Sequence, residues 1–99
     1  MDQVQVLPIA KQYASAVREI METKSIILYG SHARGTATKD SDIDIAVIVD
    51  AIPGDYLNTV SILWKLTRMI NFEIEPVLLT EADGDSGFLE TVRRTGIAV

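Results

Sequence analysis

Apolar residues recur at helical spacing near the start of the chain and form two nearly continuous runs after it. Between residues 8 and 22, apolar side chains return every three or four positions, which predicts a helix with Pro8 in its first turn. Residues 25–29 are too few for a helix and rich in strand-forming types, so they predict a buried strand. Residues 43–49 are apolar at nearly every position, which predicts a strand inside a sheet.

The second half of the chain begins with a longer amphipathic segment. Asp55 can cap a helix that extends to about Ile70. Residues 72–79 predict a third strand, in which Pro76 marks an edge or a bulge because proline cannot donate to a ladder.

Residues 80–86 are acidic and contain glycine, which predicts a loop. A short helix from Phe88 should end at Gly96, and residues 97–99 could add a last strand. The element order is helix, strand, loop, strand, helix, strand, helix, strand. It predicts one α/β (α+β) domain over residues 1–99, with a small mixed sheet flanked by helices.

The predicted helix at 55–70 carries more apolar residues than one core-facing stripe needs, Trp64 among them. Two interpretations are open at this point. Part of this helix contacts another chain, or the helix is covered by its own domain.

Composition narrows the classes of function. The 99 residues contain no cysteine and one histidine, which excludes disulfides, thiol catalysis and Cys-ligated zinc. Nine basic against fourteen acidic residues give a net charge of −5, which argues against a broad nucleic-acid-binding surface. The apolar runs are too short for a membrane span, and the N-terminal residues lack the features of a signal peptide, so a cytoplasmic location is expected.

The candidate chemistry starts where the first predicted strand ends. Residues 30–35 read Gly-Ser-His-Ala-Arg-Gly. Gly30 lets a backbone approach a ligand closely, and Ser31 can cap a helical turn whose free N–H groups attract phosphate. Arg34 could add positive charge there or pair with a nearby carboxylate.

Two aspartates follow at the start of the second predicted strand. Side chains alternate along a strand, so Asp42 and Asp44 share a face, with Cα atoms roughly 6.6 Å apart. Two carboxylates this close repel unless a cation neutralises them. Mg²⁺ suits a site built from a few carboxylates and substrate phosphate oxygens.

A third acidic element lies in the third predicted strand, where Glu73 and Glu75 share one face. If that strand neighbours the aspartate strand, one glutamate can join the cluster. A phosphate-binding turn, a metal-binding pair and a third carboxylate are the parts that phosphoryl-type transfer needs.

The pattern Gly-Ser-x-Ala-Arg-Gly followed by Ser-Asp-Ile-Asp-Ile closely resembles the DNA polymerase beta-like nucleotidyltransferase superfamily. Within it the chain looks like the small minimal nucleotidyltransferase (MNT) type. The specific motif covers residues 30–45, and the element order with the Ile-Glu-Pro strand extends a weaker resemblance to nearly the whole chain. The resemblance implies the polymerase beta-like fold.

The resemblance also implies a role for each matching residue. Gly30 and Ser31 would hold the nucleoside triphosphate, and Arg34 is added to this nucleotide-binding set for its charge. Asp42 and Asp44 would coordinate Mg²⁺ in a two-metal site. Glu75, in preference to Glu73, would be the third carboxylate, metal ligand and candidate general base, where the family often has aspartate.

Members of this family transfer a nucleoside monophosphate from a nucleoside triphosphate, here expected to be ATP, to a hydroxyl group. Several small members act as the antitoxin of a HEPN-domain protein, which implies a HEPN-type protein partner for this chain. The alternative from a different class is a non-catalytic, antitoxin-like module that binds a partner. A homo-oligomer is a further option.

Ordinary structural roles compete for several of these residues. Arg34 could form a surface salt bridge, and the aspartates could mark the solvated start of their strand. Glu73 and Glu75 could be the polar side of their own half-buried strand. His32, at the variable position of the motif, is expected to be an exposed polar residue. Solvated positions are also expected for other basic residues, namely Lys39, Lys65, Arg68, Arg93 and Arg94.

Overall fold

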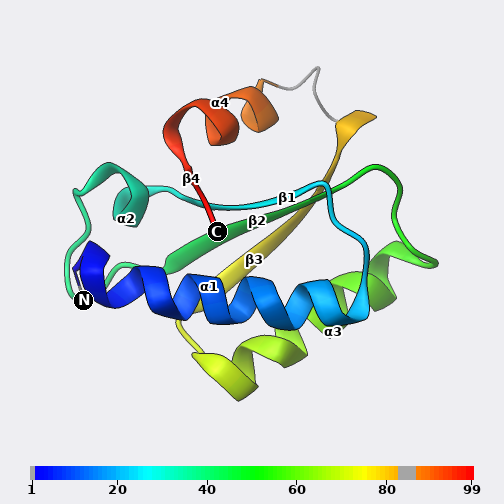
Figure 1. Cartoon of the computed structure of the whole chain (residues 1–99), viewed down its shortest axis with the longest axis horizontal. Helices are drawn as coiled ribbons and strands as arrows, with labels where there is room; N and C mark the ends of the chain where they lie inside the picture. The colour runs from blue at the N-terminus through cyan, green and yellow to red at the C-terminus, as the bar shows by residue number, and fades with distance from the viewer. Residues whose placement is uncertain (1, 83–86) are drawn as a thin grey trace.

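The computed structural model describes residues 2–82 and 87–99. The elements follow the predicted order, with one short additional helix in the predicted loop (Figure 1). The helices are α1 (Gln3–Ile20), α2 (Ser31–Arg34), α3 (Tyr56–Ile70) and α4 (Phe88–Thr95). The strands are β1 (Ser25–Tyr29), β2 (Ile43–Val49), β3 (Ile74–Thr80) and β4 (Ile97–Ala98).

Helix α1 begins at Gln3, so the predicted start at Pro8 is wrong. The Asp2 carboxylate accepts a hydrogen bond from the Gln5 N–H at 3.0 Å, and the Gln5 side chain accepts one from the Asp2 N–H at 2.9 Å. This reciprocal cap fixes the first turn. Pro8 therefore lies inside the helix, where it leaves the Val4 carbonyl without its usual N–H partner.

The sheet is mixed, as predicted, and has the strand order β3-β2-β1-β4. Strand β1 runs antiparallel to both β2 and β4, whereas β2 and β3 run parallel. Strand β3 lies at an edge, which explains why Pro76 is tolerated there, since an edge strand has backbone groups that need no ladder partner. The parallel pairing places the starts of β2 and β3 side by side.

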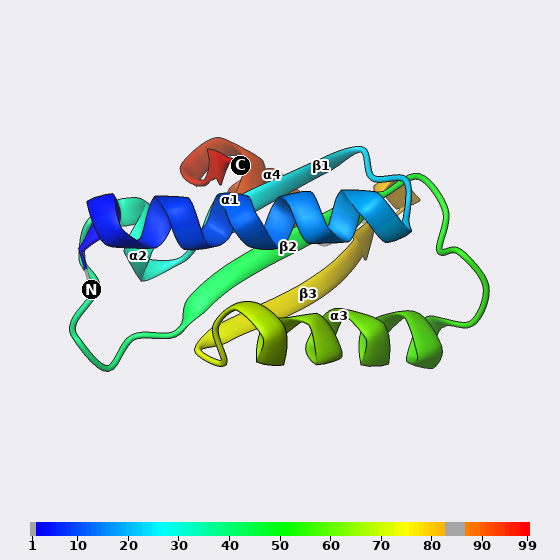
Figure 2. The ribbon, with the colours of Figure 1, turned by 60° about the horizontal axis from the view of Figure 1, so that its bottom comes forward.

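Two apolar clusters cover the faces of the sheet unequally. Figure 2 shows α1 and α3 on one side of the sheet, and α4 behind it. The α1 and α3 side packs on Ile43, Ile45 and other core residues, and the buried Tyr13 hydroxyl of α1 donates to the Leu63 carbonyl of α3 at 2.7 Å. The smaller α4 cluster packs on Ile27, Ala46 and Ile48.

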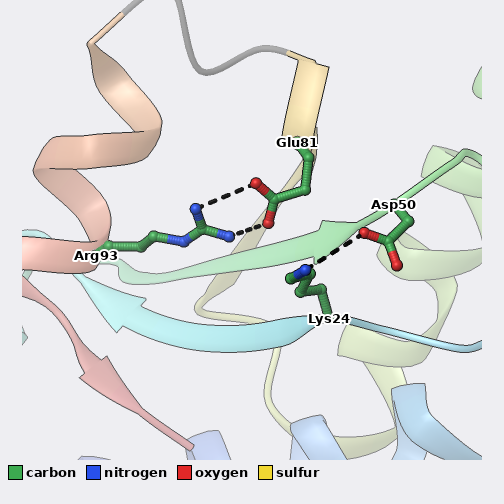
Figure 3. A network of polar contacts seen from close by, with 4 residues as sticks. All are labelled: Lys24, Asp50, Glu81 and Arg93. Carbon is green, nitrogen blue, oxygen red and sulfur yellow. Dashed lines mark hydrogen bonds and ion pairs between the residues drawn. The ribbon is translucent and has the colours of Figure 1, made fainter.

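Ion pairs form beside the ends of the strands. Arg93 of α4 makes a two-pronged contact with Glu81, directly after β3, while Lys24 pairs with Asp50 at 3.8 Å (Figure 3). Arg93 is therefore held by a carboxylate rather than left on a purely solvated face. Lys39, Lys65, Arg68 and Arg94 are exposed, as expected.

Other predicted boundaries are close to those observed. Asp55 caps α3 by accepting from the Asn58 N–H at 3.1 Å, and α4 ends at Gly96 as predicted. The predicted loop at 80–86 differs at its start, because Thr80 is the last residue of β3, and its residues 83–86 lie outside the described residues. Among the helices of residues 2–82 and 87–99, none has the length and apolarity needed to cross a membrane.

Candidate active site

The chain leaves β1 through a turn that only glycine forms without strain. Gly30 has φ 76° and ψ −153° and serves as the N-cap of α2. Ser31 is therefore the first helical residue, and the prediction that its hydroxyl caps the turn is wrong. The Gly30 carbonyl accepts from the Arg34 N–H at 3.1 Å, and the N–H groups of the first turn have no partner within the helix.

The same glycine makes room for a carboxylate of β2. A Cβ atom at Gly30 would lie 2.4 Å from Oδ2 of Asp44, which is far inside contact distance. The missing side chain thus lets the Asp44 carboxylate rest directly against the backbone of the turn. Turn and carboxylate form one continuous surface.

The carboxylates meet because of strand register. Asp44 pairs with Glu75 across the parallel strands β2 and β3, and with Tyr29 across the antiparallel strands β1 and β2. Paired residues point to the same face, so Tyr29, Asp44 and Glu75 form a row on the face that α4 covers only in part. Asp42 lies just before β2, close enough for its carboxyl to act on that of Glu75.

Burial, and then neighbouring like charges, raises the pKa of two acids at this site. Burial and then the charge of Asp42 raise the pKa of Asp44, while His32 and Arg34 act in the opposite direction. Partial desolvation, Asp42 and Asp44 raise the pKa of the exposed Glu75. The three acids therefore repel one another, and a bound cation would relieve that repulsion.

Tyr29 is a member of the site that sequence reasoning missed. Burial, and then the charges of Asp44 and Glu75, raise the pKa of its hydroxyl to about 12. Its ring meets Phe88 of α4 edge to face, with centroids 5.6 Å apart. The sequence signal that could have revealed Tyr29 is its position as the last residue of β1. Antiparallel pairing of β1 with β2 places that position opposite Asp44.

Glu73 and Glu75 occupy different environments, because Glu73 lies in the turn before β3 and not, as predicted, in the strand with Glu75. Glu73 precedes β3, and its backbone carbonyl accepts from the Ile43 N–H at 2.9 Å. The carboxylate of Glu75, which pairs with Asp44 across the two parallel strands, interacts with both aspartates. The geometry thus favours Glu75 as the third carboxylate.

The two remaining motif residues differ in exposure. Arg34 is exposed and makes no ion pair with any residue in 2–82 or 87–99, so the salt-bridge alternative has no partner there. Its charge acts on Asp44 across the turn. His32, expected to be exposed, is only 2% exposed, because its ring turns inward from α2 toward Ser41.

The donor set fits Mg²⁺ in one specific way. It consists of carboxylate oxygens, the ligands that Mg²⁺ prefers. Within the described residues, however, no three acidic or histidine side chains are arranged to hold a metal ion by themselves. Two aspartates that share a metal with phosphate oxygens and water match this incomplete cage better than an all-protein site does.

Comparison with known proteins agrees with this geometry. A family model described as a nucleotidyltransferase domain matches residues 10–81. Two proteins of Methanocaldococcus jannaschii, each named a putative protein adenylyltransferase, are 31% and 32% identical to this chain. The matches cover 72% and 78% of this chain, and 81% and 76% of the relatives.

Two solved structures share the fold at 23% identity and a TM-score of 0.70. One is a crystal structure of a putative nucleotidyltransferase from Sulfolobus solfataricus, with 97% of this chain and 80% of that chain covered. The other is described as a putative minimal nucleotidyltransferase, with 100% of this chain and 97% of that chain covered. These similarities match the predicted polymerase beta-like, minimal nucleotidyltransferase fold.

Proposed function

This chain belongs to the nucleotidyltransferase domain family, and on that premise we propose that it transfers an adenylyl group from ATP to a protein hydroxyl group in a metal-dependent reaction. The observation that carries the proposal is the position of Asp44. Its carboxylate touches the Gly30 turn on one side and stands beside Glu75 on the other. A triphosphate on the turn would thus lie within reach of the acidic row.

The proposed reaction is an in-line displacement at the α-phosphorus of ATP. The acceptor oxygen forms a bond to that phosphorus, the bond to the bridging oxygen of the β-phosphate breaks, and pyrophosphate leaves. Glu75, which pairs with Asp44 across the parallel strands, takes the proton of the acceptor hydroxyl. When bound, two Mg²⁺ ions would neutralise the charge that develops on the attacking and leaving oxygens.

Other residues of the chain would bind and orient the nucleotide. Asp42 and Asp44 would hold the metal ions against the triphosphate. The N–H groups at Gly30 and Ser31 would donate to phosphate oxygens. Arg34 is exposed beside the turn and would add positive charge to the same oxygens.

The choice of ATP and of a protein acceptor follows the relatives, which are named for protein adenylylation. We further propose that the acceptor belongs to a HEPN-type partner protein, with this chain as the antitoxin of the pair. The exposed apolar side chains of α3 support a protein contact: Leu57 is 73% and Met69 80% exposed, and Trp64 is 43% exposed. Phe72, two residues beyond the end of α3, is 83% exposed.

The alternative is a module that neutralises its partner by binding alone. The same exposed α3 residues support it, because a docking face is all that it requires. The two functions differ in their need for the carboxylates. A binding module keeps its effect when Asp44 is changed, whereas an adenylyltransferase loses it.

The test is label transfer to a co-expressed HEPN-type protein. Native protein should transfer label from ATP carrying ³²P at the α-position in the presence of Mg²⁺, and should transfer none from the γ-position. Asp44→Asn should abolish transfer, while Asp50→Asn, an exposed carboxylate beyond the end of the same strand, should preserve it. Neutralisation of the partner by Asp44→Asn protein without any label would instead establish the binding module.

A further inference from the structure

His32 is a buried polar residue to which the proposed reaction gives no role. Its ring Nε2 lies 3.4 Å from the Ser41 carbonyl oxygen, while Nδ1 is buried and has no hydrogen-bond partner among the described residues. A carbonyl oxygen can only accept, so we assign a proton to Nε2, which is then the donor. A long, buried N–H···O contact then joins α2 to the residue before Asp42.

Ser41 closes a tight turn that leads into β2. Its hydroxyl accepts from the Thr38 N–H at 2.9 Å, and its N–H donates to the Thr38 carbonyl at 3.1 Å. On the other side of Asp42, the Ile43 N–H donates to the Glu73 carbonyl at 2.9 Å. Asp42 itself is exposed and lies outside the strand, so its position depends on these two anchored neighbours.

The other end of the His32 contact is also held. The Gln3 side-chain amide donates to the carbonyls of His32 and Ala33 at 3.1 and 3.3 Å. Figure 2 shows the start of α1 lying beside α2, where these contacts form. The first turn of α1, the helix after Gly30 and the Ser41 turn are thereby connected through His32.

We propose that His32 is a positioning residue that fixes Asp42 relative to the Gly30–Ser31 turn. The proposal rests on the proposed function, in which the turn holds the triphosphate and Asp42 holds a metal ion. The Asp44 carboxylate also touches the turn, but it does so from inside β2, whereas Asp42 lies before the strand and is joined to α2 by residues 34–40, most of which are exposed. A direct contact from α2 to Ser41 shortens that connection and keeps the two ligand-binding elements in register.

Two variants with amide side chains distinguish the effect of the Nε2 contact with Ser41 from the effect of packing a buried side chain. The amide nitrogen in His32→Gln can reach the position of Nε2, whereas in His32→Asn it reaches only as far as Nδ1. His32→Leu fills the space without any nitrogen and replaces the asparagine variant if that chain does not fold. Thermal melts of the metal-free proteins establish which variants fold.

Two measurements then read the position of Asp42. Amide hydrogen exchange in the metal-free protein reports the anchoring of Asp42 and Ile43 directly. The Mg²⁺ concentration that gives half of the ATP-dependent melting shift reports metal binding. In His32→Asn, amide exchange should be about five- to tenfold faster and the required Mg²⁺ concentration about five- to tenfold higher, which is the effect of one net hydrogen bond. Both quantities should stay near their native values in His32→Gln.

The proposal is overturned if His32→Asn has the native rate of amide exchange and the native Mg²⁺ requirement. It is also overturned if the glutamine and asparagine variants are impaired equally, because loss of ring packing would then be the cause. Failure of the proposed function looks different. In that case Mg²⁺ and ATP leave the melting of the native protein unchanged, while the exchange comparison still shows whether His32 anchors Ser41.

Discussion

Replacement of Gly30 by alanine perturbs the fold and the proposed site through one methyl group. The backbone at φ 76° and ψ −153° belongs to a region that glycine alone populates readily, so alanine costs about 1–3 kcal/mol. For a domain of this size each kcal/mol lowers the melting temperature by about 4–8 °C, which gives a fall of about 4–24 °C.

The methyl group also meets the Asp44 carboxylate. Its carbon would lie 2.4 Å from Oδ2, so that oxygen must retreat by about 1 Å to reach ordinary contact distance. A displacement of about 1 Å in a catalytic group can cost on the order of 10²-fold in rate. We therefore expect Gly30→Ala to lose Mg²⁺-dependent ATP binding and adenylyl transfer even at temperatures where it is fully folded.

Gly54→Ala is the matched control. Gly54 also has a positive φ, 75°, yet a Cβ there meets nothing within 4 Å. This variant should lose stability but keep the melting shift that Mg²⁺ and ATP cause. The reasoning is refuted if Gly30→Ala has the same melting temperature as the native protein. It is also refuted if Mg²⁺ and ATP raise the melting temperature of Gly30→Ala as much as that of Gly54→Ala.

Three further predictions concern the acids and helix α3. Glu75→Gln should slow adenylyl transfer about 10²–10⁴-fold with a smaller effect on ATP binding, whereas Glu73→Gln should leave the rate near native; equal rates for the two variants would remove Glu75 from the mechanism. Because the pKa of Asp44 is raised, the metal-free folded state binds a proton more readily than the unfolded chain does. Asp44 therefore adds to the free energy of unfolding at low pH, and this contribution is lost as the pH rises through its raised pKa. Asp44→Asn should therefore melt at or above the native temperature at neutral pH without metal, and the difference should vanish below about pH 4; a variant that melts lower at neutral pH would contradict this sign. Trp64→Glu should weaken transfer to the partner protein while preserving the ATP-dependent melting shift, and unchanged partner labelling would exclude this part of α3 as the docking face.

The strands and most helices could be predicted because their signals are local. The apolar runs at 25–29 and 43–49 can hardly be anything but buried strands, and Asp55 caps α3 through its own side chain. The start of α1 was missed because Pro8 looked like a first-turn residue. The reciprocal Asp2 and Gln5 cap was a stronger local signal, and it stabilises the turn before the proline.

The sequence predicts which residues of the site share a face of one strand, but not how the strands pair with each other. Alternation places Asp44 and Glu75 on one face of their own strands, but their register in β2 and β3 depends on the packing of the whole sheet. The burial of His32 and the inclusion of Tyr29 depend on contacts between distant segments, at Ser41 and Asp44. Sequence patterns at a single position carry no trace of such contacts.

The central claim is that the aspartates hold divalent metal against a nucleotide on the Gly30–Ser31 turn. Anomalous diffraction from crystals grown with Mn²⁺ and a non-hydrolysable ATP analogue tests it directly. The account predicts a manganese peak roughly 2–2.5 Å from carboxylate oxygens of Asp42 and Asp44, with the triphosphate over the turn. It is contradicted if the ordered nucleotide lies elsewhere, such as in the cleft of about 490 Å³ beside Lys24, and no manganese peak stands at the aspartates.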